Sequence, residues 1–180
     1  LLVRSIELTA RQAGFNPRLI EKDYFCSVVL EYLAASEPEL TFKGGTSLSK
    51  AYKIIDRFSE DIDLTYDIRK LISDLVGNDD SLPTNRSQAS KWTKAVRQRL
   101  PEWISDQVRP VLEAALARDQ LQVKLEIGGA EREKLLLHYP AIKHGTGYVP
   151  PVVTLEFGGR ATGEPHHVLP VTCDMDGHVE

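Results

Sequence analysis

Sulfur is scarce in this sequence, which has one methionine and two cysteines, Cys26 and Cys173, among its 180 residues. So few cysteines exclude a scaffold held together by disulfides and are typical of proteins in a reducing compartment. We therefore expect a cytoplasmic protein. Cys26 lies in an apolar helical stretch, where we expect it to be a small core residue.

Long apolar runs are also missing. No stretch approaches the roughly 20 apolar residues that a membrane-spanning helix needs, so we expect no membrane partner. We expect no signal peptide in this sequence, because Arg4 and Glu7 interrupt the apolar start at Leu1 and Leu2. The sequence opens without an initiator methionine and stops at Glu180 in a polar stretch, so we expect a fragment of a longer protein.

An overall excess of positive charge is missing as well. The net charge is −4 and the pI is about 5.8, which excludes a protein that coats nucleic acid without specificity. Residues 86–99 are the exception, because this segment carries five basic residues and no acid. Either its side chains contact an RNA backbone, with Lys91 and Lys94 as candidates, or it forms a solvated amphipathic helix.

The apolar pattern places most helices before most strands. It predicts helices over the ranges 1–13, 17–35, 48–56, 86–99 and 101–117. It predicts strands over the ranges 40–43, 61–67, 121–127, 134–139, 152–157 and 168–172. This order favours an α+β fold in which helices flank one mixed sheet. The length fits a single domain over residues 1–180, with a helical part at 1–36 and a core at about 37–175.

Two aspartates, Asp61 and Asp63, stand two residues apart in the strand predicted at 61–67. Alternate residues of a strand share a face, so both carboxylates are expected on one side, roughly 7 Å apart at the backbone. Neighbouring carboxylates repel each other unless a cation, hydrogen-bond donors or water compensate. The pair is therefore either a site for a divalent cation, which prefers oxygen ligands, or the solvated polar face of an edge strand.

A glycine turn precedes this pair. Gly44 and Gly45 can adopt backbone conformations that other residues avoid, and Thr46 or Ser47 can cap the helix that follows. Free N–H groups at a helix start bind phosphate, and Lys50 lies one turn further on. The turn either holds a phosphate or is an ordinary strand-to-helix connection. It is not a Walker A loop, because Gly-Lys-Ser/Thr is missing.

A third carboxylate on a later strand would complete the pattern of polymerase-β-type nucleotidyltransferases, which combine such a turn with an Asp-x-Asp strand. Glu156, set between apolar residues of the strand predicted at 152–157, fits best. Glu126 is the alternative. Either residue is otherwise an outward polar side chain of an alternating strand.

Two blocks of the sequence together resemble the AbiEii/AbiGii toxin family of nucleotidyltransferases. The first is FKGGTSLSKAY at residues 42–52, and the second is RFSEDIDL at residues 57–64. The segments 21–24, 155–160 and 162–165 also resemble signatures of that family. The resemblance extends in patches from about residue 19 to about residue 170.

The resemblance implies a polymerase-β-like nucleotidyltransferase core that uses Mg²⁺ or Mn²⁺ and a nucleoside triphosphate. By position, it assigns nucleotide binding to Gly44, Gly45, Thr46, Ser47, Lys50 and Arg57. It assigns catalysis and metal binding to Asp61, Asp63 and Glu156. It further implies the toxin of a toxin–antitoxin or phage-defence system, with tRNA, another RNA or a protein as acceptor and an antitoxin as partner. The C-terminal helical part of full-length relatives is expected to be missing here.

Two other functions fit the same motifs. A catalytically idle module would bind a nucleotide or a partner without turnover, and a metal-dependent phosphoesterase would use water as the acceptor. The adjacent histidines His166 and His167 face opposite sides of an extended segment, so we expect loop residues rather than a metal site. Glu21 and Asp23 either support the residues of the site from behind or are ordinary acids on a helix surface.

Overall fold

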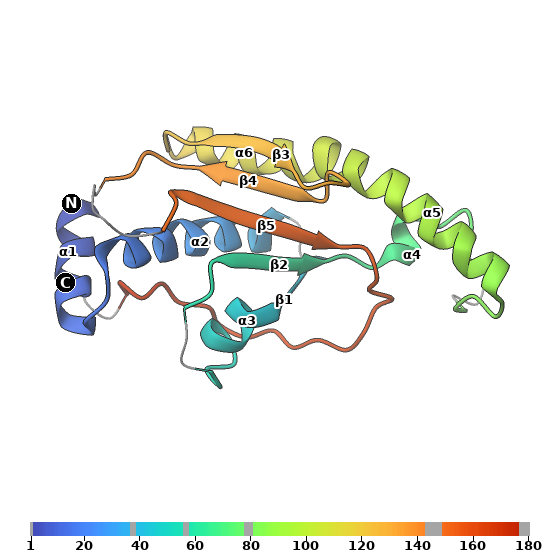
Figure 1. Cartoon of the computed structure of the whole chain (residues 1–180), viewed down its shortest axis with the longest axis horizontal. Coiled ribbons are helices and arrows are strands. Elements are labelled where there is room, and N and C mark those ends of the chain that lie inside the picture. The colour runs from blue at the N-terminus through green and yellow to red at the C-terminus, as the bar shows by residue number, and fades with distance from the viewer. Residues whose placement is uncertain (1, 37–38, 56–57, 78–80, 143–148, 177–180) are drawn as a thin grey trace.

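In the part of the chain that the structure describes, five strands form one sheet, and helices pack against one of its faces (Figure 1). This computed structural model describes residues 2–36, 39–55, 58–77, 81–142 and 149–176. The predicted α+β class with a mixed sheet flanked by helices is confirmed. No helix formed by these residues is long and apolar enough to cross a bilayer.

Two helices, α1 (Leu2–Ala13) and α2 (Pro17–Ser36), form the N-terminal part as predicted. The start of α2 follows from its sequence. Asn16 accepts a hydrogen bond from the Arg18 N–H at 3.0 Å, and Pro17 takes the first helical position, where its missing N–H costs nothing. Cys26 is buried in α2, as expected of a small core residue.

The sheet has the strand order β1-β2-β5-β4-β3. Its strands are β1 (Thr41–Lys43), β2 (Asp61–Thr65), β3 (Lys124–Gly128), β4 (Lys134–His138) and β5 (Val152–Gly158). Strands β2 and β5 pair in parallel, and every other pairing is antiparallel. The strand predicted at 168–172 is wrong. That segment is irregular, and Val168 is 96% exposed, so no buried face supports a strand there.

The core lies against one face of the sheet, because alternate strand residues are apolar. These residues are Ile62, Leu64, Leu125, Leu135, Leu137, Val153, Leu155 and Phe157. They pack in one cluster with the buried side chains of α2 and of the long helical segment after residue 85. Figure 1 shows α2 and the last part of that segment behind the sheet, so the polar residues of the strands are left on the opposite face.

That helical segment consists of α5 (Arg86–Trp103), a π-helix η1 (Ile104–Val108) and α6 (Arg109–Arg118). The short helix α4 (Ile68–Leu71) precedes it. The prediction that Pro101 begins a new helix is wrong, because α5 continues through it. Val96, Leu100, Ile104 and Val108 form one buried stripe across the proline, and this packing outweighs its poor helix propensity.

One polar contact joins α2 to the end of α6. The hydroxyl of Tyr32 donates to a carboxylate oxygen of Asp119, whose carboxylate also pairs with the guanidinium of Arg118. The hydrogen bond from Arg118 has the larger effect and that from Tyr32 the smaller, and together they lower the pKa of Asp119 to about 2. A carboxyl whose pKa is lowered by folding stabilises the protein only while it is ionised.

The variant Tyr32→Phe should therefore lower the free energy of unfolding more at about pH 6 than at about pH 2. The contribution of Asp119 is full above its unfolded pKa of about 4 and disappears as the pH falls through about 2. Urea unfolding at several pH values measures the difference. In an Asp119→Asn background the effect of Tyr32→Phe should no longer depend on pH, and a persisting dependence would contradict the assignment.

Candidate active site

The pairing of β2 with β5 places two carboxylates side by side. Asp63 lies opposite Glu156 in the parallel register, and Asp61 lies opposite Thr154. The alternative acid, Glu126, lies on β3, where it is opposite Leu136 at the other end of the strand order. Of the two candidate acids, the structure thus brings Glu156 and not Glu126 next to the aspartates.

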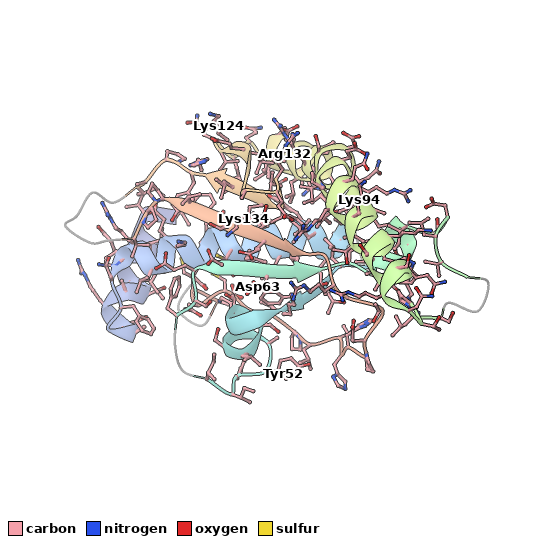
Figure 2. The ribbon with its side chains drawn as sticks, turned by 45° about the vertical axis from the view of Figure 1, so that its right-hand side comes forward. Tyr52, Asp63, Lys94, Lys124, Arg132 and Lys134 are labelled. Atoms are coloured by element: carbon pink, nitrogen blue, oxygen red, sulfur yellow. The ribbon has the colours of Figure 1, made fainter. Side chains whose placement is uncertain are left out.

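Two lysines flank these carboxylates in one row across the sheet. The register runs from Lys43 on β1 to Asp63, then to Glu156 and finally to Lys134 on β4. The Lys134 ammonium lies 2.8 Å from Glu156 Oε2. In Figure 2, Asp63 and Lys134 lie on either side of β5. Lys134 could not be predicted from the sequence, because only the strand register reveals that it faces Glu156.

The electrostatics of this row follow from its charge order. Partial burial raises the pKa of the Asp63 carboxyl, and the negative charge of Glu156 raises it further, while Lys43 opposes both effects. The hydrogen bond to Glu156 raises the pKa of Lys134. The two lysines thus supply positive charge beside a carboxylate pair that repels itself.

The glycine turn is itself the start of a helix. Helix α3 spans Gly44–Lys50, so the prediction that it begins near residue 48 behind a Thr or Ser cap is wrong. Gly44 has φ +74° and redirects the chain within the helix start, which leaves Thr46 and Ser47 inside the helix and buried. The Thr46 hydroxyl donates to the Asp61 carbonyl at 2.5 Å and so fastens α3 to β2.

Gly44 lies directly against the carboxylate of Asp63. A Cβ atom added to Gly44 would overlap Asp63 Oδ2, so only glycine leaves room for this carboxylate. A second glycine, Gly158, leaves space for Lys43, whose ammonium lies 2.8 Å from the place where a Cβ would stand. Both glycines therefore make room for charged groups of the row.

The remaining predicted nucleotide-binding residues differ in their surroundings. Lys50 forms an ion pair with Asp23 and lies 3.1 Å from the carbonyl of Thr172. Arg57 lies outside the described residues. His166 and His167 belong to an irregular segment, as expected. Among the residues that the structure describes, no three His, Cys, Asp or Glu side chains converge as a formed metal site.

Comparison with known proteins identifies the family. The model of the family described as nucleotidyl transferase AbiEii toxin, type IV toxin–antitoxin system, matches residues 29–180. The chain therefore belongs to this family of nucleotidyltransferase toxins, and the family predicted from the sequence is confirmed.

Among solved structures, MenT4, a nucleotidyltransferase toxin from Mycobacterium tuberculosis H37Rv, is similar with a TM-score of 0.47 and 20% sequence identity. The match covers 93% of this chain and 48% of MenT4, so the chain spans about half the length of that toxin. No curated protein matches the sequence.

The contact between Gly44 and Asp63 can be tested with two glycines of similar backbone. Gly14 has φ +72° and no atom within 4 Å of an added Cβ, whereas Gly44 has φ +74° and faces Asp63. Gly14→Ala should destabilise the protein by about 1 kcal/mol through backbone strain alone. Gly44→Ala should cost at least about 1 kcal/mol more, because Asp63 must also move. If chemical unfolding showed the same decrease in the free energy of unfolding for both variants, the Asp63 carboxylate would move aside at no energetic cost.

Proposed function

We propose that this chain transfers a nucleotidyl group from a nucleoside triphosphate to an acceptor, with a divalent cation held by Asp61, Asp63 and Glu156. The observation that carries the proposal is the register of β2 and β5, which sets Asp63 beside Glu156 and next to the Gly44 turn. Membership of the AbiEii family supports the same chemistry.

The donor set fits Mg²⁺ or Mn²⁺, because both ions prefer oxygen ligands. Burial raises the pKa of Asp63, the neighbouring charge of Glu156 raises it further, and a cation would relieve the repulsion between the two carboxylates. A divalent cation bound there would also lower the pKa of an acceptor hydroxyl and screen the charge of the triphosphate.

Gly44, Gly45, Thr46 and Ser47 would bind phosphate oxygens through their backbone N–H groups, as the resemblance implies. The Thr46 hydroxyl already donates to the Asp61 carbonyl, which favours its N–H group for this task. Lys50 would act at a distance, because Asp23 holds its ammonium.

In the proposed reaction, the acceptor oxygen attacks the α-phosphorus and forms a new O–P bond. The bond between the α-phosphorus and the oxygen that bridges to the β-phosphate breaks, and pyrophosphate leaves. Glu156 takes the hydroxyl proton, and Lys43 and Lys134 neutralise charge on the phosphates. Most of the rate enhancement would come from positioning and electrostatics.

The proposed acceptor is RNA, such as tRNA, and the proposed protein partner is an antitoxin, as expected for the toxin of a type IV toxin–antitoxin system. Helix α5 offers a surface for an RNA backbone, because Lys91 and Lys94 are both exposed on it (Figure 2 labels Lys94).

The role of Glu156 can be tested against the other strand acid. Glu156→Gln should lower transfer of labelled nucleotide to total tRNA about 100-fold or more, since the residue next to Asp63 loses its charge. Glu126→Gln removes the same charge from β3 and should stay within about twofold of wild type. The assay uses each labelled triphosphate with Mg²⁺ or Mn²⁺, and Asp63→Asn should abolish transfer.

Other products would point to other functions. Release of nucleoside monophosphate with nothing attached to RNA or protein would identify a phosphoesterase. Protection of the protein by a nucleotide without turnover would identify a binding module. Equal loss in Glu156→Gln and Glu126→Gln would remove the assignment of the third carboxylate.

The role of Lys134 has its own matched control in Lys124. Lys134→Met should lower transfer at least about tenfold, because it removes a positive charge 2.8 Å from Glu156. Lys124 on β3 pairs with the exposed Glu126, at 3.8 Å, and Lys124→Met should leave transfer almost unchanged. Comparable effects of the two variants would show that Lys134 contributes only to the general charge of the sheet.

A further inference from the structure

Helix α2 contains three consecutive charged residues that are all buried. Glu21, Lys22 and Asp23 are 1%, 2% and 1% exposed. Consecutive residues of an α-helix lie about 100° apart around its axis, so these side chains point in three directions and meet three different parts of the protein. Buried charges are costly unless each one has a partner, so their contacts are informative. The reading of Glu21 and Asp23 as surface acids is thereby excluded.

Each of the three charges has a partner outside α2. Glu21 Oε1 accepts a hydrogen bond from the Ile142 N–H at 2.6 Å. The Lys22 ammonium donates to Glu60 Oε2 at 2.7 Å. Asp23 forms an ion pair with Lys50 through one carboxylate oxygen. Its other oxygen accepts the N–H of Asp174 at 2.7 Å.

Two of these partners lie at the ends of the elements that build the candidate site. Glu60 directly precedes Asp61, the first residue of β2, and Lys50 is the last residue of α3, which begins at Gly44. The hydrogen bond from Thr46 to the Asp61 carbonyl joins α3 to β2 directly. Helix α2, helix α3 and strand β2 are thus connected pairwise by polar contacts.

The two connected elements differ in how much support they have elsewhere. Strand β2 pairs with β1 on one side and β5 on the other, so its ladder forms without Lys22, which instead fixes Glu60 at the entry to the strand. Helix α3 has only seven residues, and a helix this short has little stability of its own. Its position over β2 therefore depends on contacts at its two ends.

We infer that Lys22 and Asp23 are positioning residues, which hold β2 and α3 in the relative placement that keeps Gly44 against Asp63. This inference rests on the proposed function for its consequence in catalysis. A displacement of about 1 Å between reacting groups can cost about 100-fold in rate, so the fixed charges of α2 would act without touching the substrate.

The test uses Lys22→Met, Glu60→Met and the double variant. Each single change should lower kcat about 10- to 100-fold and change the KM for the nucleoside triphosphate less than about threefold. The double variant should be no worse than either single variant, because both remove the same contact. Tyr32→Phe is the control, since it removes a hydrogen bond of α2 to Asp119 instead.

All variants are assayed where each is fully folded by circular dichroism. Additive losses in the double variant, or a Lys22→Met protein with wild-type kcat, would overturn the inference. So would an equal loss of kcat in Tyr32→Phe, because the effect would then be one of general stability.

Amide hydrogen exchange gives a second readout that needs no activity. Asp23→Asn should raise exchange at least about tenfold in Gly44–Lys50, because it removes the charge that pairs with Lys50. Lys22→Met should raise exchange at Asp61, because Glu60 loses its partner, and Tyr32→Phe should leave both regions unchanged. If wild type and Asp63→Asn are equally inactive, the proposed function fails, and exchange alone decides whether α2 positions these elements. Unchanged exchange in both Asp23→Asn and Lys22→Met would refute positioning in either case.

Discussion

The repulsion between Asp63 and Glu156 is the constraint on which the candidate site depends. Parallel pairing of β2 and β5 holds the two carboxylates opposite each other, and nothing in the backbone can separate them. The structure compensates on both sides. Lys43 and Lys134 bring positive charge to the ends of the row, and Gly44 leaves the Asp63 carboxylate the space it occupies. In the proposed reaction, a cation and a triphosphate would replace the lysines as partners, because these ammonium groups are at the end of long, flexible side chains.

Local patterns in the sequence predicted much of this site. Strict alternation in β2 placed Asp61 and Asp63 opposite the buried Ile62 and Leu64, and the structure has that arrangement. The sequence blocks around the glycine turn and the aspartates also indicated the correct family, which the match over residues 29–180 confirms. Such features depend on neighbours in the sequence and can be seen without a structure.

Features that depend on distant residues could not be predicted. The choice between Glu156 and Glu126, and the presence of Lys134, follow from strand order and register, which no local pattern encodes. Helix α5 passes through Pro101 because its buried stripe packs against strands far along the chain. The buried charges of α2 look like surface charges in the sequence, since their partners lie at residues 50, 60, 142 and 174.

The parallel contact between β2 and β5 also determines when the candidate site can form during synthesis. Thr65 and Gly158, which are paired at the ends of these strands, lie 93 residues apart in the chain. A nascent chain whose β5 is still inside the ribosome has both aspartates but lacks Glu156 and the strand that holds it in place. Because β5 also separates β2 from β4, Lys134 has no carboxylate to face until then. The candidate site therefore stays incomplete until most of this chain has emerged from the ribosome that makes it.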